Sequence, residues 1–511
     1  MMKNLIIATC AVLGITALNA CSLQEIPDTP APTAETITVT AYTAEEQTGT
    51  KTTLSGLETH WVKDVDKIGI FSPQAAGQKN NVPYTAQSNG KTSDFTGSLV
   101  WGAGEHEFCA YYPYNSGYTG DREAIPFSIP SEQTQSAADN TDHIGALDYM
   151  VASRKVSPTG PVNFNFVHLF TMIEFQIKGS GTLKKIRLTG PNLLACTNSE
   201  IKFWDDLSAT TNLILSNAFN YVTVTLTTPA ILSDSPTSVY MMVVPRNHSE
   251  DLRIALNFND GTWKEITKAP PTTTEGGSFF KGFQGTKKYV VTLDTADSEW
   301  YDVFEDSRDH QLYPYVTIGS QVWMKRNLAY LPEVYLSDSG SDTDPRYYVY
   351  GFERTNVAEA KITANYYTYG VLYNRPAAMN GAASSNSNPS GVQGICPDGW
   401  HLPSNAEWVD LRTHLGIESS HKMRETGTTH WTAPNTGATN ESGFTALPGG
   451  RRETGTGPFS GIGNSTYWWT STEESSTFAV FYIHYDSADL KCLYVDANFR
   501  DYGFSVRCIK D

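Results

Sequence analysis

The chain has 511 residues, which is too long for one ordinary domain and predicts two to four. Hydrophobic residues make up 40% of it, enough for packed cores, whereas charged residues make up only 18%, and aromatic residues are plentiful. The net charge of −17 argues against a nucleic-acid partner, because phosphate backbones are recognised through Lys and Arg. This polar, uncharged and aromatic profile is typical of extracellular β-structure.

The N-terminus has the pattern of an export signal. Lys3 precedes a short apolar run that ends at Leu18, and a polar, Pro-rich stretch follows. The motif Leu18-Asn19-Ala20-Cys21 resembles the lipobox of bacterial lipoproteins, in which the Cys becomes the lipidated, palmitate-bearing N-terminus. We therefore expect a signal peptide over 1–20, a tether over 21–35 and an outer-membrane anchor on Cys21. The alternative is a soluble secreted protein with a chance Cys at the cleavage site.

Residues 36–295 carry strand patterns and almost no helical periodicity. Ile37, Val39 and Ala41 alternate with threonines, as in a half-buried strand, and turn clusters separate further apolar runs. Strands at this spacing are best buried as sandwiches. Since about 260 residues is generous for one sandwich, we predict two, over 36–166 and 167–295.

Several ordered motifs of this region resemble landmarks of the fimbrillin family, the pilus and adhesin lipoproteins of Bacteroides-type bacteria. They are Lys51-Thr-Thr-Leu, Trp61 with Asp66–Phe71, Tyr111–Tyr114, Ile129–Gln133, Asp148–Ala152 and Phe164–His168. The resemblance implies two tandem transthyretin-like β-sandwiches. It also implies assembly with other pilus subunits by strand exchange, in which a protease removes the N-terminal strand and a neighbour's strand fills the groove.

The processing site departs from the family pattern. Family pilins are cleaved after an arginine near the N-terminus, but this chain has no arginine before Arg122. Lys51, in a polar stretch, is the possible processing site in its place. An ordinary solvated lysine is the alternative.

The segment from Asp294 to Asp309 separates the β-region from the C-terminal part. Its acidic residues outnumber its one arginine, so we predict a solvated, self-repelling connector. Beyond it, residues 316–324 read as a hairpin turning at Gly319-Ser320.

One helix is well defined. Ser404 and Glu407 predict an N-terminal capping box, Trp408, Leu411 and Leu415 share one helical face, and Gly416 ends the helix.

The C-terminal motifs closely resemble the Fibrobacter succinogenes major paralogous domain. They are Ile318–Met324 with Asn327-Leu328, Tyr369–Asn374, Cys396–Pro403, Trp468–Ser471 and Gly503–Cys508. The resemblance implies a C-type lectin-like α+β fold over 296–511, including the acidic linker, and a disulfide between Cys396 and Cys508. Two buried thiols are the alternative for this pair.

The remaining Cys109, Cys196 and Cys492 have no evident partner, and Cys109 and Cys196 are expected to pack as small apolar residues. The predicted fold class is thus multidomain, two tandem β-sandwiches followed by an α+β domain.

No catalytic motif stands out. The chain lacks HExxH, CxxC, G-x-S-x-G and a phosphate-binding Gly-rich loop. Residues 402–408 resemble a segment of formylglycine-generating enzymes, but those enzymes need cysteines at the reaction centre, and here Cys492 stands alone. Glu407 also has a structural role as a capping carboxylate. We therefore predict a protein that is not an enzyme.

Ligand sites are sought among the C-terminal loops. The Glu-Pro-Asn or Gln-Pro-Asp triplet of calcium-dependent lectins is missing, so we expect no cofactor and no metal site, with calcium left open. Asp496 and Asn498 form an oxygen pair that could contact a ligand. Tyr467 and Trp469 could form a sugar platform, although Trp468 and Trp469 face opposite ways in a strand and at least one must be core.

These observations predict a cell-surface adhesin lipoprotein, a minor or tip subunit of a strand-exchange pilus (fimbrium) in the cell outer membrane. Its head binds a host glycan or protein. A pilin that donates its C-terminal strand cannot easily carry a folded domain beyond that strand, whereas a tip subunit only accepts one. The alternative is a non-pilus surface lipoprotein that captures glycans for nutrient uptake.

Overall fold

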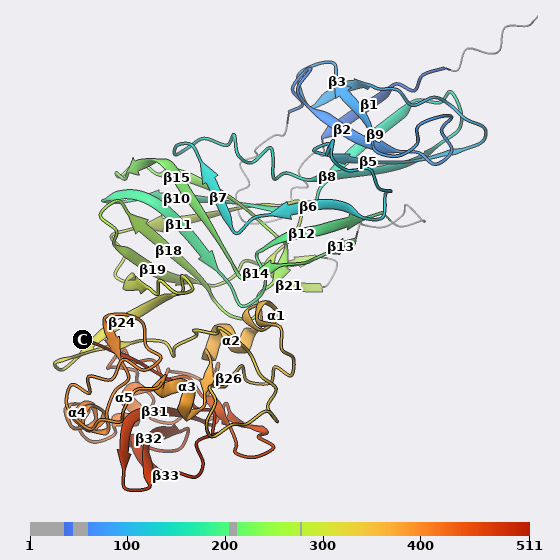
Figure 1. Cartoon of the computed structure of the whole chain (residues 1–511). Coiled ribbons are helices and arrows are strands. Elements are labelled where there is room, and N and C mark those ends of the chain that lie inside the picture. Colours follow the sequence, from blue (N-terminus) through green and yellow to red (C-terminus); the bar gives the residue numbers. More distant parts are fainter. Residues whose placement is uncertain (1–34, 44–59, 204–211, 276–277) are drawn as a thin grey trace, which may run out of the picture.

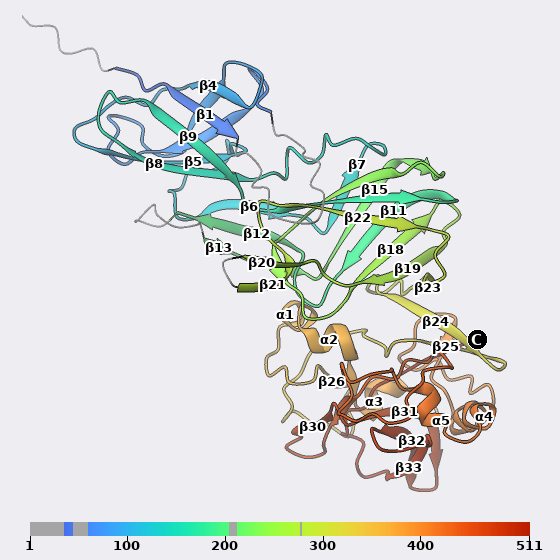
Figure 2. The same cartoon turned by 180° about the vertical axis from the view of Figure 1, so that it is seen from behind.

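In the computed structural model, residues 35–43, 60–203, 212–275 and 278–511 are described, and β-strands are the main regular element (Figure 1). Three units follow one another along the molecule: an N-terminal barrel, a central sandwich, and a C-terminal unit of strands and short helices (Figures 1 and 2). No helix in the described part of the chain is long and apolar enough to cross a membrane. The predicted lipidation residue Cys21 and processing residue Lys51 lie outside the described residues.

The N-terminal unit is a closed barrel. Its strands are β1 (Val39–Thr43), β2 (Lys67–Phe71), β3 (Val82–Ala86), β4 (Thr92–Thr96), β5 (His106–Tyr112), β8 (Met150–Val156) and β9 (Val162–His168). β1 closes the barrel by pairing antiparallel with β4 and parallel with β9. The predicted alternation is confirmed, since Val39 and Ala41 are fully buried in the barrel core while Tyr42 is 38% exposed.

Two strands leave the barrel and join the central unit. β6 (Ile125–Ile129) and β7 (Glu132–Gln135) lie between β5 and β8 in the sequence. β6 pairs with β12 (Ala195–Lys202), and β7 pairs in parallel with β15 (Tyr221–Ile231). The buried Gln133 adds side-chain hydrogen bonds to both backbone groups of Met242. The barrel and the central unit are therefore joined by ladder hydrogen bonds as well as by the chain.

The central unit is a β-sandwich. A three-stranded sheet, β16-β10-β22, packs against β15, β11, β18 and β19 of a ten-stranded sheet, and apolar side chains from both fill the space between them. The other strands of this unit are β10 (Thr171–Lys178), β11 (Thr182–Thr189), β13 (Asn212–Ile214), β14 (Ala218–Phe219), β16 (Thr237–Val243), β17 (Arg246–Asn247), β18 (Leu252–Phe258), β19 (Trp263–Lys268), β20 (Thr272–Glu275), β21 (Ser278–Phe283) and β22 (Lys288–Asp294).

The ten-stranded sheet continues from the sandwich into the C-terminal unit. β23 (Tyr301–Glu305) pairs with β19 on one side and with β24 (Leu312–Ile318) on the other. The prediction of a solvated connector over 294–309 is therefore wrong for this strand. Negative charge did not prevent pairing, because Val303 is buried while Asp302 points to solvent, and the buried Asp306 is paired with Arg308 at 2.7 Å. Figure 1 shows β24 reaching out of the central unit.

Beyond β24, the predicted hairpin is confirmed: β24 turns at Gly319-Ser320 into β25 (Gln321–Met324). The same sheet then adds β34 (Ile509–Lys510) and β28 (Trp400–His401). A separate five-stranded sheet has the order β30-β29-β31-β32-β33. The remaining elements are β26 (Tyr347–Tyr348), α1 (Val357–Lys361), α2 (Ala364–Tyr369), β27 (Leu372–Tyr373), α3 (Arg375–Met379), α4 (Asn405–Leu415), α5 (Ser419–Met423), β29 (Gly449–Arg452), β30 (Phe459–Ile462), β31 (Ser465–Glu474), β32 (Thr477–His484) and β33 (Lys491–Asp496).

Helix α4 is the predicted helix. Ser404 caps it, Glu407 completes the capping box, and Gly416 follows its last turn. The buried Trp408 stacks on Phe481 of β32, with ring centroids 5.2 Å apart. The apolar face of the helix thus covers one side of the five-stranded sheet, as the spacing of its residues predicts.

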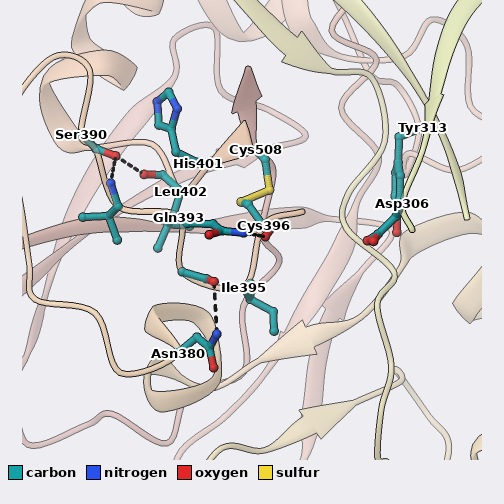
Figure 3. Close-up of a disulfide and its surroundings, with 12 residues drawn as sticks. Asp306, Tyr313, Asn380, Ser390, Gln393, Ile395, Cys396, His401, Leu402 and Cys508 are labelled. Carbon is teal, nitrogen blue, oxygen red and sulfur yellow. Dashed lines mark hydrogen bonds between the residues drawn. A yellow bond between two sulfur atoms is a disulfide. The ribbon is translucent and has the colours of Figure 1, made fainter. Parts of the chain in front are cut away.

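The disulfide between Cys396 and Cys508 is present, and Figure 3 shows it beside Ile395, Leu402 and His401. Cys396 precedes β28 and Cys508 precedes β34, and these two strands pair. The bond therefore ties the end of the ten-stranded sheet to the start of the helical segment. Cys109 and Cys196 are unpaired and buried, as expected of small apolar side chains, and Cys492 is unpaired and partly exposed.

Replacing both Cys396 and Cys508 by Ser should lower the free energy of unfolding of the C-terminal unit by about 4–5 kcal/mol. The physical reason is the lost chain-entropy restriction on a loop spanning 112 residues. Denaturant unfolding followed by tryptophan fluorescence measures the difference. Cys492→Ser is the matched control and should change the value by less than about 1 kcal/mol. Equal midpoints for the double variant and the parent would contradict the expectation.

Candidate binding cleft

A cleft of about 490 Å³ lies between the central unit and the C-terminal unit. Its first wall is the face of the ten-stranded sheet turned away from the sandwich core. Arg253 of β18 lies opposite Thr267 of β19, and Glu265 of β19 lies opposite Tyr301 of β23, so these four side chains share that face. The second wall comes from the C-terminal unit, where Lys325 and Arg326 directly follow β25, and α2 and the loop 425–430 add further side chains.

The two walls are held together by specific contacts. Arg326 Nη2 donates to both carboxylate oxygens of Glu265, at 2.8 and 3.0 Å. The guanidinium of Arg253 lies 3.7 Å from the ring centroid of Tyr367 and donates to its carbonyl at 2.6 Å. The Tyr367 hydroxyl donates in turn to the Asp251 carbonyl at 2.6 Å. Glu265 and Tyr367 are buried and Arg253 and Arg326 are half-buried, so these contacts are screened less by water than surface pairs are.

Lys325 is the notable cation of the cleft. Its Nζ lies 3.6 Å from the ring centroid of Tyr301, and no carboxylate of the described residues forms an ion pair with it. Burial, together with the positive charges of Arg326 and Arg507, lowers the pKa of the Lys325 ammonium to about 8. The nearby Glu265 is already engaged by Arg326. Lys325 thus faces the cleft as a partly desolvated cation that lacks a carboxylate counterion among these residues.

His430 links the two units at the other end of the cleft. Its Nε2 lies 2.9 Å from Glu250 of the central unit and its Nδ1 lies 2.7 Å from Glu425 of the C-terminal unit. Burial alone would lower the pKa of this imidazole, but the hydrogen bonds with Glu250 and Glu425 outweigh it and raise the pKa to about 9. A protonated His430 therefore places one positive charge between two carboxylates that would otherwise repel each other.

The cleft has the chemistry of a binding site. Its lining offers cations, hydroxyl groups and one exposed aromatic ring. Within the described ranges, no group of three or more His, Cys, Asp or Glu side chains is arranged to hold a metal ion. The free thiol of Cys492 lies elsewhere, on β33, and burial raises its pKa, which disfavours the nucleophilic thiolate. This cleft was not predicted from the sequence. The adjacent Lys325-Arg326 pair just after a conspicuous hairpin was the one local signal for it.

The predicted sugar platform lies in the core. Trp469 is fully buried and its indole N–H donates to the Tyr373 carbonyl at 2.7 Å. Tyr467 is 9% exposed and stacks between Tyr482 and Phe504. Trp468 is also fully buried, on the opposite side of the sheet. Both sides of β31 are covered, so Tyr467 and Trp469 pack the fold and present no open face to a ligand.

The predicted oxygen pair is exposed. Asp496 ends β33, and its carboxylate accepts the backbone N–H of Asn498 at 2.9 Å. The pair thus closes its own turn. It lies apart from the cleft described above, whose lining includes neither residue.

Glu407 has a second role that its capping position did not reveal. One oxygen accepts the Ser404 backbone N–H at 2.8 Å, and the other lies 2.7 Å from Nε2 of His401. His401 Nδ1 contacts Asp511 at 2.7 Å. Burial opposes charge on His401, but these two carboxylates outweigh it and raise its pKa. The buried Glu407 and His401 and the exposed Asp511 thus join α4 to the chain end beside the disulfide.

His430→Gln should reduce the pH dependence of stability. Because the folded-state pKa of His430 is raised from 6.5 to about 9, its stabilisation is complete below about pH 6.5 and is lost as the pH rises through 9. Thermal unfolding between neutral pH and about pH 10 should therefore show a steeper fall of the midpoint in the parent than in the variant. The exposed His414→Gln serves as control and should follow the parent. Superimposable profiles for the parent and His430→Gln would rule out this role.

Solved structures similar to the chain include bacterial proteins described as cell adhesion or fimbrial proteins. A proposed cell adhesion protein of Bacteroides ovatus is 17% identical, with 56% of this chain and 99% of that chain covered and a TM-score of 0.35. The tip fimbrial protein Mfa3 of Porphyromonas gingivalis, with a C-terminal truncation, is 12% identical, with 52% and 96% covered and a TM-score of 0.28. With scores this low, neither likeness carries an argument about this chain.

Family models give the clearer comparison. None of the curated proteins matches the chain significantly. Both family resemblances of the sequence analysis are confirmed by model matches. Residues 50–300 match the fimbrillin-like family, and residues 316–510 match the Fibrobacter succinogenes major domain.

Proposed function

We propose that the protein is an adhesin lipoprotein on the surface of the outer membrane, and a minor or tip subunit of a pilus assembled by strand exchange. The fimbrillin-like match and the expected lipidation of Cys21 support this function. In this proposal, two transthyretin-like sandwiches carry a C-type lectin-like head. The head binds a host glycan or protein.

The position of β1 is the observation that carries the assembly part of the proposal. β1 is paired on both edges and is the parallel neighbour of β9, while the other barrel pairings among the described strands are antiparallel. Its side chains Val39 and Ala41 are fully buried. Removing β1 would therefore open a groove with unpaired backbone on both sides and empty apolar pockets, which a strand from another subunit could fill. Cleavage at Lys51 would separate β1 from the rest of the barrel chain.

The continuous sheet favours a tip or minor subunit over a stalk subunit. The last strand of the sandwich, β22, is paired with β10, and the chain then runs into β23, which is paired on both edges. Donating β22 to a neighbour would require β23 and the C-terminal unit to be pulled away with it. A subunit that only accepts a strand needs no such rearrangement. Labelled antibodies against residues 316–510 should therefore mark pilus ends, and labelling along the shafts would contradict the tip position.

A non-pilus glycan-capture lipoprotein is the second candidate. The cleft between the central and C-terminal units favours it, because ligand binding there needs no strand exchange. Strand acceptance by the barrel separates the two functions.

The test is strand replacement in the folded chain. A protease site introduced at Lys51 and then cut should allow a labelled peptide of residues 36–43 to replace β1. A peptide with Val39→Asp should bind at least about a hundredfold more weakly, because its carboxylate would be buried without a partner. Fluorescence anisotropy measures the binding.

Tyr42→Asp is the matched control peptide, since Tyr42 is exposed on the same strand. It should bind nearly as well as the parent peptide. Failure of the cut, still folded barrel to take up any of the peptides would exclude the strand-exchange function and leave glycan capture.

A further inference from the structure

Basic side chains slightly outnumber carboxylates in the cleft between the central and C-terminal units, although the whole chain has a net charge of −17. The lining holds five basic residues, counting a protonated His430, and the four carboxylates of Glu250, Asp251, Glu265 and Glu425. Arg253, Lys325 and Arg326 all line it, and Glu265, the carboxylate closest to this group, is paired with Arg326. Glu250 and Glu425 share the single positive charge of His430. The site is thus far less acidic than the rest of the chain, and a basic group in it that lacks its own carboxylate can attract an anion.

Lys325 is the cation best placed to meet an anionic ligand. Tyr301 covers one side of its ammonium group, and no hydrogen-bond acceptor or carboxylate among the described residues engages its donors. A partly buried ammonium group without a counterion is unfavourable, and an arriving anion would relieve that cost. Arg326 lies next to it, with a buried Nε that has no hydrogen-bond partner in the described structure.

The rest of the lining favours a sugar as the carrier of the negative charge. Ser249, Thr267 and Thr429 contribute hydroxyl side chains to the lining, and the hydroxyl of Thr445, which also lines it, is already bonded to Asn440 and Gly443. Hydroxyl side chains can both donate to and accept from the ring hydroxyls of a saccharide. The volume of about 490 Å³ is within the range of small-molecule sites.

We propose that this cleft binds an anionic sugar, with Lys325 holding the carboxylate or sulfate group and the surrounding hydroxyl side chains contacting the ring. The proposal rests on the binding role given above to the C-terminal unit and names the ligand class. It assigns recognition to the junction of the two units, and the buried Tyr467 and Trp469 take no part. A sugar carboxylate and a sugar sulfate both place one negative group on a polar ring. The experiment below distinguishes the two.

The experiment titrates the full chain by calorimetry with glucuronate, glucose 6-sulfate and unmodified glucose. At least one anionic sugar should bind measurably, and glucose should bind at least tenfold more weakly. Lys325→Met should weaken the anionic sugar by roughly tenfold to a hundredfold, the usual effect of losing a charged hydrogen bond. Lys325→Arg should retain most of the binding because it keeps the charge.

Lys264→Met is the matched control, since Lys264 lies on β19 next to Glu265 but lines a different cavity. It should leave the affinity unchanged. Thermal unfolding of each variant shows whether it is folded. If Lys325→Met does not fold, the charge-preserving Lys325→Arg still tests the role of Lys325.

The proposal would be overturned if glucose and the anionic sugars bound alike, if none of them bound, or if Lys325→Met and Lys264→Met had equal effects. Binding of a tri-glutamate peptide in place of both anionic sugars would likewise overturn it in favour of an acidic protein ligand. Strand replacement by the peptide of residues 36–43 does not involve this cleft. A failure to bind sugars is therefore distinguishable from a failure of the assembly function.

Discussion

The attachment of the C-terminal unit and the geometry of the cleft both depend on the pairing of β23 on both of its edges. Backbone hydrogen bonds to β19 and β24 make one sheet out of strands from the sandwich and from the C-terminal unit. A flexible linker at this point would leave the two units free to move apart. Instead, the ladder sets the direction in which β24 and β25 leave the sandwich, and so brings Arg326 to Glu265 and Tyr367 to Arg253. The cleft exists because this geometry is defined.

The same constraint connects binding and assembly. The C-terminal unit is attached through a strand in the interior of a sheet, and a pull on it is resisted by main-chain hydrogen bonds as well as by the buried ion pair of Arg326 and Glu265. At the other end of the molecule, the barrel is closed by β1, a short strand whose removal affects few other contacts of the central unit. In the proposed function, β1 is the strand that a partner replaces and the C-terminal unit is the firmly attached head.

What could be predicted from the sequence follows short-range rules. The capping box of Ser404 and Glu407, the turn at Gly319-Ser320 and the alternation in β1 depend on neighbours a few residues away, and all three are confirmed. The pairing of Cys396 with Cys508 followed from a family resemblance, because spacing alone does not decide which cysteines meet.

What could not be predicted depends on long-range pairing. β6 and β7 pair with strands of the central unit, although their neighbours in sequence belong to the barrel. The amino-acid composition of a strand does not indicate which unit it joins. The acidic segment around Tyr301 was predicted to be a connector because its charge indicates exposure to water. Charge does not indicate which strand a segment pairs with. The cleft brings together Arg253, Lys325 and His430 from distant parts of the chain, so the adjacent Lys325-Arg326 pair could not by itself reveal it. Trp469 looked available for recognition until the fold placed apolar layers on both sides of its strand.

Hydrogen exchange of the backbone amides of β23 tests the central claim most directly. If the sheet is continuous, the amides of residues 301–305, which point alternately toward β19 and β24, should be protected to a degree similar to those of the neighbouring strands. Rapid exchange throughout residues 301–305, with β19 and β24 still protected, would show two independent units joined by a linker and would contradict the account.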